Sequence, residues 1–381
     1  MAEAIGVSES AAGRRAAEAW NEPLPYDRWA RSIGIPIYRD YFIPDAKTVE
    51  LARWDERECD AAFLQLVGNE GVAETRVTEI APGKTLPPLT FGFDEMVYVL
   101  EGRGLTTLWR EGGARTTFEW QKHSLFLIPR HRTHQLSNTQ GSSTARLLHC
   151  NYLPLALGSV GDPDLFLNVK LPAHAGDGNG ASLYSEATAI EQPGAGGPKG
   201  GVFWYGNFFP SLSAWDKLTP FRGRGSGGHV IWIRFPGSPI TCHMSVFPAQ
   251  TYKKAHRHGP GFVIVIPGGA GYSVLWPEGQ DKVVVPWQEG TVFVPPYRWF
   301  HQHFNLGAQP ARYLALHPPR GLPGYSEAID EPMRDQIEYP DEEPSVRARF
   351  EVEIAKRGLS SRMPEEAYRD ANYEWAYGDG D

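Results

Sequence analysis

The sequence contains an internal repeat at a constant spacing of 167 residues, and this feature limits the possible folds more than any other. Residues 101–112 (EGRGLTTLWREG) align without a gap with residues 268–279 (GGAGYSVLWPEG). The same spacing matches further tryptophan, proline, histidine and asparagine positions, namely Trp120 with Trp287, Pro129 with Pro296, His134 with His301 and Asn138 with Asn305. A repeat of this kind predicts two copies of one structural module.

Each copy reads as a series of short strands. Residues 95–100 and 262–266 are rich in β-forming side chains and end before glycine, whereas residues 125–128 and 291–294 end before proline. The chain has 41 glycines and 32 prolines, so turn residues recur every eight to twelve positions. This spacing is typical of an all-β sandwich or barrel.

The composition excludes several classes of partner. With a net charge of −8 and no basic run, the chain is not expected to bind nucleic acid. Its apolar runs stop after about five residues, which is too short for a membrane span. Cys59, Cys150 and Cys242 lie far apart and form no metal-binding or disulfide pattern, so we expect a cytoplasmic protein.

Both copies resemble the two sequence motifs of the cupin superfamily, G-x5-H-x-H-x3/4-E-x6-G and G-x5-P-x-G-x2-H-x3-N. The N-terminal copy supplies Gly83, Leu89, Phe91, Glu95 and Gly102, followed by His123, Pro129, His131, His134 and Asn138. The C-terminal copy supplies Gln250, His256, His258, Phe262 and Gly269, followed by Gly290, Pro296, Arg298, His301 and Asn305. The resemblance covers residues 75–150 and 240–318 well.

The resemblance implies an all-β bicupin, that is, two tandem cupin barrels of the double-stranded β-helix or jelly-roll type. We expect an N-terminal arm (residues 1–70) containing a helix-like piece at residues 11–20, an N-terminal cupin (71–155) and a Gly/Pro-rich connector (156–200). A C-terminal cupin (201–320) and a tail (321–381) follow. Val346, Phe350 and Ile354 recur every four residues, which predicts an amphipathic helix over residues 342–357.

The C-terminal copy carries the predicted metal site. His256 and His258 share one face of a strand because they are two residues apart, and the resemblance supplies His301 as the third ligand. Phe262 stands where cupins usually carry a glutamate ligand. Three neutral histidines without a carboxylate are similar to the gentisate-type and diketone-cleaving dioxygenases, although here the site is in the C-terminal cupin.

The N-terminal copy has lost both histidines of the first motif, to Leu89 and Phe91. Glu95 and His134 remain, but two donors seldom hold a catalytic ion. We therefore expect a structural module, with Glu95 and His134 hydrogen-bonded to each other. His131 and His134 are expected to have structural roles.

Three further residues are candidates for catalysis. His303 shares the face of His301 and is a fourth ligand, a proton carrier or a solvated residue of the rim. Tyr252, like Lys254, shares strand parity with the two histidines and is expected to line the pocket. Arg298 either pairs with a substrate carboxylate or sits in a surface turn. His243 is expected to pack near the site and not to bind the metal.

These features favour a mononuclear non-haem metal enzyme. The preferred hypothesis is an Fe(II) dioxygenase acting on a small aromatic hydroxy acid or an enolisable oxygenated compound. With Mn(II), Ni(II) or Zn(II), the same site would serve a non-redox lyase, isomerase or hydrolase. A metal-free ligand-binding cupin is the third hypothesis. The expected partners are a small-molecule substrate and further copies of the chain in a homo-oligomer.

Overall fold

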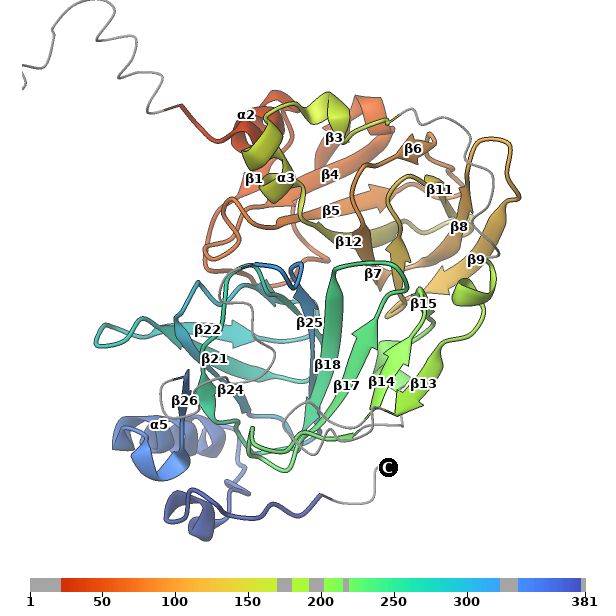
Figure 1. Ribbon diagram of the computed structural model, residues 1–381. Coiled ribbons are helices and arrows are strands. Elements are labelled where there is room, and N and C mark those ends of the chain that lie inside the picture. The colour runs from red at the N-terminus through yellow and green to blue at the C-terminus, as the bar shows by residue number, and fades with distance from the viewer. Residues whose placement is uncertain (1–21, 170–179, 192–201, 215–218, 323–334, 378–381) are drawn as a thin grey trace, which may run out of the picture.

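The computed structural model describes residues 22–169, 180–191, 202–214, 219–322 and 335–377. It contains two β-sandwich modules, one following the other along the chain (Figure 1). The helix predicted over residues 11–20 lies outside the described residues. No helix among the described residues is long and apolar enough to cross a membrane.

The N-terminal module consists of two antiparallel sheets of the jelly-roll kind. Its larger sheet contains β1 (Ile37–Tyr38), β3 (Ala52–Trp54), β4 (Cys59–Leu64), β5 (Glu74–Ile80), β12 (Ala145–Asn151), β7 (Glu95–Glu101), β10 (Leu125–Ile128) and β15 (Phe208–Phe209). Among the described strands of this module, β1 alone pairs in parallel, with β4. The smaller sheet contains β6 (Leu89–Thr90), β11 (Thr133–Asn138), β8 (Arg103–Trp109) and β9 (Thr116–Gln121).

The C-terminal module repeats this arrangement. Its larger sheet contains β13 (Thr188–Glu191), β14 (Val202–Tyr205), β16 (Thr219–Pro220), β17 (His229–Arg234), β18 (Thr241–Phe247), β25 (Ala311–His317), β20 (Val263–Gly268), β23 (Val292–Phe293) and β2 (Phe42–Ile43). The smaller sheet contains β22 (Val283–Trp287), β21 (Gly271–Trp276), β24 (Phe300–Asn305), β19 (Ala255–His256) and β26 (Gln336–Ile337). The all-β fold predicted from the repeat is confirmed.

The modules repeat individual hydrogen bonds as well as strands. The indole N–H of Trp120 donates to Thr106 Oγ1 at 3.0 Å, and that of Trp287 donates to Ser273 Oγ at 3.1 Å. Gly271 is needed beside the second indole because a Cβ there would lie 2.6 Å from the ring. The matching residues of the repeat therefore hold matching places in the two structures.

The positions of motif glycines keep a left-handed backbone even where the residue is not glycine. Gln250 and Arg298 both have φ 62°, and in the other module His131 has φ 62° and His123 has φ 68°. This conformation is unfavourable for residues with a Cβ. The tight turns of the two modules are therefore preserved although glycine is absent.

Each module borrows an edge strand from the other half of the chain. The N-terminal segment β2 pairs with β23 in the register Phe42 to Phe293, and β15 pairs with β10 in the register Phe208 to Phe126. A hydrogen bond follows each of these strand pairs. Pro44 O accepts from Thr291 Oγ1 after β2, and Pro210 O accepts from Ser124 Oγ after β15, both at 2.7 Å. Each sheet thus contains a strand from beyond the boundaries that the sequence predicted at residues 70 and 155.

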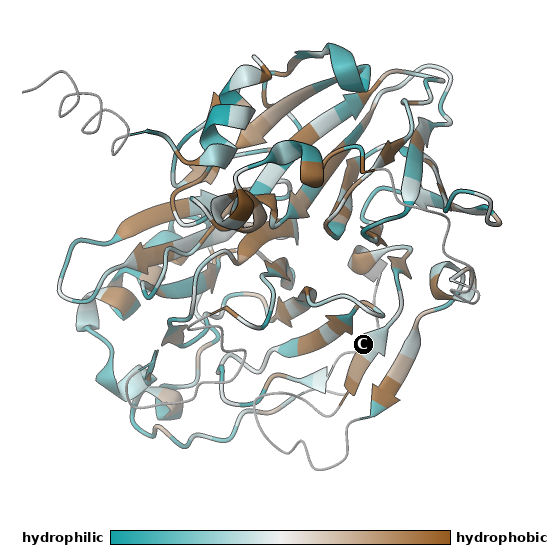
Figure 2. Cartoon of the chain, turned by 45° about the horizontal axis from the view of Figure 1, so that its top comes forward, coloured by the Kyte–Doolittle hydropathy of each residue, from teal (hydrophilic) through white to brown (hydrophobic). Residues whose placement is uncertain are grey.

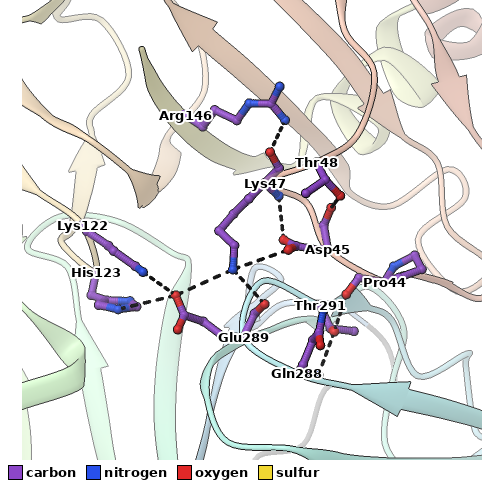
Figure 3. A network of polar contacts seen from close by, with 10 residues as sticks. All are labelled: Pro44, Asp45, Lys47, Thr48, Lys122, His123, Arg146, Gln288, Glu289 and Thr291. Carbon is purple, nitrogen blue, oxygen red and sulfur yellow. Dashed lines mark hydrogen bonds and ion pairs between the residues drawn. The ribbon is translucent and has the colours of Figure 1, made fainter. Parts of the chain in front are cut away.

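A polar network fixes the N-terminal arm to the C-terminal module (Figure 3). Lys47 Nζ donates to the backbone oxygen of Glu289 at 3.0 Å and lies 3.5 Å from Asp45 Oδ2. The Glu289 carboxylate also pairs with Lys122 Nζ at 2.6 Å, and Arg146 donates to Lys47 O at 2.5 Å. Residues from three distant parts of the sequence therefore meet at the junction of the modules.

Among the described residues, three α-helices lie outside the sheets, namely α2 (Pro25–Ser32), α3 (Leu153–Val160) and α5 (Pro344–Ala355). The predicted C-terminal helix is confirmed as α5, which buries Phe350 and Ile354 against the outer face of the C-terminal module. Hydrophobic residues gather in the strands, while hydrophilic residues are frequent in the loops between them (Figure 2). Cys59, Cys150 and Cys242 are all buried.

Candidate metal centre

Three histidines converge inside the C-terminal module. His256 ends the short strand β19, which pairs with β24 so that His256 lies directly opposite His301. Their ring centroids are 4.1 Å apart, and the ring of His258 lies 4.7 Å from that of His301. One nitrogen of each residue lies within 4.8 Å of the others. The sequence prediction thus identified three side chains that meet in space.

Burial keeps these imidazoles in the form that binds metal. Desolvation lowers the pKa of His258 to about 3 and holds the pKa values of His256 and His301 well below their usual range. Each ring therefore stays neutral at pH 7 and keeps a lone pair. His258 Nδ1 is 2.8 Å from Gly259 O, whereas His256 Nδ1 is buried without a hydrogen-bond partner. Neutral rings, their convergence and this orphaned nitrogen fit a divalent ion.

Phe262 closes the side of the site where a glutamate ligand would enter. Its ring centroid is 4.0 Å from that of His258 and 4.7 Å from that of His317. The side chain is 4 % exposed. The site therefore has an apolar wall at this position in place of a carboxylate.

His303 lies in the same cavity as the three histidines and is 2 % exposed, so its placement on a solvated rim is wrong. Its Nδ1 is 2.7 Å from Ser273 Oγ, and its ring centroid is 5.5 Å from that of His301. Burial lowers the pKa of His303 to about 3. The fourth-ligand and proton-carrier roles both remain compatible with this position.

Tyr252 and Lys254 do not line the cavity, which corrects the expectation based on strand parity. Tyr252 pairs with Phe304, and His256 pairs with His301, so the register slips by one residue between the two pairs. Such a bulge reverses which side chains point inward. The Tyr252 hydroxyl consequently donates to Glu342 Oε2 at 2.9 Å on the outer face, next to α5. Lys254 pairs with a carboxylate of the tail, Glu338.

Arg298 also has a partner of its own. Its Nη2 donates to Asp335 Oδ1 at 2.5 Å and its Nη1 to Asp335 Oδ2 at 3.2 Å. Arg257 contacts the same carboxylate at 3.2 Å. Arg298 occupies a left-handed turn, and its side chain ties the tail to the module.

The cavity contains residues that the sequence did not single out. Arg224 is 7 % exposed and comes from the glycine-rich stretch at residues 223–228, which in the sequence resembles an ordinary loop. His317 ends β25, and its Nε2 lies 2.7 Å from Nδ1 of His243. The proximity of His243 agrees with its expected position beside the site. The cavity has a volume of about 30 Å³.

The N-terminal module holds a salt bridge at the matching place. The predicted hydrogen bond between Glu95 and His134 is not formed, because Glu95 has other partners. Glu95 accepts from Arg76 Nη2 at 2.5 Å and from Asn151 Nδ2 at 3.0 Å, and lies 2.8 Å from His149 Nδ1. Burial would raise the pKa of Glu95, but Arg76 and His149 hold it well below its usual range. Among the described residues, the three histidines of the C-terminal module are the one group that could hold an ion.

Comparison with solved structures identifies the architecture. A structure of oxalate decarboxylase from work on its substrate binding mode and reaction specificity covers 89 % of this chain and 88 % of its own, with a TM-score of 0.50 and 13 % identity. The fold is that of a bicupin. A mutant of the Bacillus subtilis enzyme covers 86 % of this chain and 88 % of its own (TM-score 0.49, 12 % identity). No protein-family profile and no curated protein sequence matches this bicupin.

Proposed function

We propose that the protein is a mononuclear metal-dependent enzyme whose active site is formed by His256, His258 and His301. The observation that carries this proposal is the convergence of three buried, neutral imidazoles in one module, while the other module fills the same place with an ion pair. A ligand set retained in one copy of a repeat and replaced in the other indicates a division of roles between the modules.

The reaction that the site supports best is dioxygenation by Fe(II). A metal bound by three neutral histidines keeps its full positive charge and would serve as a Lewis acid or as a route for electrons between an organic anion and oxygen. In this setting Phe262 excludes water and carboxylate from one side. His303 is placed to hold or release a proton, with Ser273 fixing its ring at 2.7 Å.

The size of the cavity favours a small substrate. A volume of about 30 Å³ is more than the ~10–15 Å³ that one water molecule needs, and it has room for only a few non-hydrogen atoms. A compact enolisable acid therefore requires less movement of the surrounding loop than an aromatic hydroxy acid does. Of the two substrate classes expected from the sequence, we favour the enolisable one.

A non-redox lyase or hydrolase is the second candidate. The observation in its favour is the position of His303, an imidazole in the same cavity that can exchange a proton with a substrate held by a Lewis-acidic ion. The identity of the bound metal separates the two reactions.

Elemental analysis of the purified full-length protein tests the proposal. We expect about one ion per chain, lost in His301→Ala and retained in His134→Ala, which removes the matching imidazole of the other module. Iron would support the dioxygenase and justify an oxygen-uptake screen. Zinc, manganese or nickel would favour the non-redox reaction. No ion after anaerobic reconstitution with each of these metals would overturn both.

A further inference from the structure

Arg224 is a buried cation beside the three histidines. It lies in the loop between β16 and β17, and it lines the same cavity as His256 and His301. Its guanidinium donates to the side-chain oxygen of Gln336 at 3.2 Å. Among the described residues no carboxylate forms an ion pair with it. Burial lowers its pKa to about 10, so the group still carries its charge at neutral pH.

Within the described residues of the module, no carboxylate balances the charge of Arg224. Lys253 is a second buried basic residue, whose Nζ contacts Ser245 Oγ at 2.7 Å and the ring of Phe221 at 4.4 Å. Burial and the charge of Arg224 hold its pKa well below the usual range of a lysine. The described part of the C-terminal module contains no acidic residue that is buried to the same degree. The N-terminal module differs, since its buried Arg76 contacts two carboxylates.

A buried charge without a counter-charge is costly, so its presence beside a cavity requires an explanation. A bound metal would add further positive charge, because the three histidines are neutral. A negative ligand from solution would supply the counter-charge that the described residues lack. A guanidinium offers a planar pair of donors that matches the two oxygens of a carboxylate.

We propose that Arg224 is a specificity-determining residue that binds the carboxylate of a small anionic substrate next to His256, His258 and His301. The inference deepens the proposed function, because it names the substrate class of the same site. The cavity limits the part of the substrate held there to the size of formate, unless the loop at residues 221–228 moves.

Formate and formamide form a matched pair of probes, since they have the same size and differ in charge. Binding of each to the full-length, metal-loaded protein is measured by calorimetry and by the shift in the midpoint of thermal unfolding, at constant ionic strength set with sodium chloride. We expect formate to bind and formamide to bind about tenfold more weakly or not at all.

Three variants locate the binding group. Arg224→Gln is expected to weaken formate binding about tenfold or more with metal content unchanged, and Arg224→Lys to weaken it less. Arg222→Gln removes an exposed arginine of the same loop and should leave formate binding as in the wild type. Without formate, Arg224→Gln should unfold at a temperature no lower than the wild type, because it removes an unbalanced buried charge.

Equal formate affinity in the wild type and Arg224→Gln would overturn the inference, as would equal binding of formamide or no binding of formate by the wild type. Repeating the titration on the metal-free protein separates the two proposals. A protein that holds no metal but binds formate through Arg224 contradicts the proposed enzyme and supports the anion site. A protein that holds metal but does not bind formate supports the proposed enzyme and contradicts the anion site.

Discussion

Arg76 Nη2 and Glu95 Oε1 lie 2.5 Å apart inside the N-terminal module, at positions where the repeat places His243 and Phe262 in the other module. The N-terminal module thus contains its own cation, bound permanently by its own carboxylates. The C-terminal module carries Phe262 in place of the acid and His243 in place of the arginine. The same location in the fold holds an ion pair in the N-terminal module and a wall of the candidate metal site in the C-terminal module.

Glu95→Gln is expected to lower the free energy of unfolding by about 3–5 kcal/mol, because it leaves a buried guanidinium short of one counter-charge. The metal content should not change, since the histidine triad is in the other module. Denaturant unfolding at pH 7 and elemental analysis provide the two measurements. Glu101→Gln, at the exposed end of the same strand, is the control and should change stability little. Loss of metal from Glu95→Gln would show that the modules do not divide their roles.

Phe262→Glu should tighten binding of a divalent metal by about tenfold or more, because it places a carboxylate next to His258. Competition with a chromophoric chelator measures the affinity. Phe262→Gln has the same shape without the charge and should not tighten binding. If the two variants bind alike, the metal does not lie on this side of His258.

Glu342 is expected to make stability depend on pH. Burial raises its pKa to about 8, and Glu338 adds to this rise, although the hydrogen bonds from Gln302 and Tyr252 oppose it. The folded state holds this proton more tightly than the unfolded chain does. The stability contributed by protonated Glu342 is therefore complete below pH 4.5 and is lost as the pH rises to about 8.

The free energy of unfolding of the wild type should therefore fall with pH in this range, by at most ~1.4 kcal/mol per pH unit. In Glu342→Gln this fall should disappear, so that the variant is more stable than the wild type at pH 8. The measurement is the free energy of unfolding between pH 5 and pH 9. Glu343→Gln is the control, since Glu343 is exposed and pairs with Lys282. An unchanged slope in Glu342→Gln would mean that this carboxyl group titrates normally in the folded protein.

Gly225→Ala should detach the C-terminal tail from the loop that carries Arg224. A Cβ at residue 225 would lie 2.2 Å from the hydroxyl of Tyr339, and φ is +70°. Gly237→Ala has a similar φ of +71° with no neighbouring atom within 4 Å, so it isolates backbone strain, which costs roughly 1 kcal/mol. Any loss of stability in Gly225→Ala beyond that in Gly237→Ala measures the clash with Tyr339. Limited proteolysis should cut the tail of Gly225→Ala faster, and equal cleavage of both variants would contradict this contact.

The repeat and the spacing of turn residues were enough to predict the all-β fold, and the period of a strand placed His256 and His258 on one face. His301 came from the resemblance to the cupin motifs. The side-chain direction of Tyr252 was not predictable, because one bulged residue reverses the parity. Arg224 was missed because a loop has no period from which its direction could be read. The partner of Glu95 was missed because Arg76 comes from a strand outside the motifs.

The exchanged edge strands β2 and β15 also have a consequence for biosynthesis. A ribosome releases the N-terminal module before Phe208 and Phe209 exist, so strand β10 waits with an unpaired edge while the second half is made. Meanwhile Phe42 and Ile43 have no partner until β23 emerges. Neither half can complete its native hydrogen bonding alone, and separate expression of the two halves should yield products that mature only when they are combined.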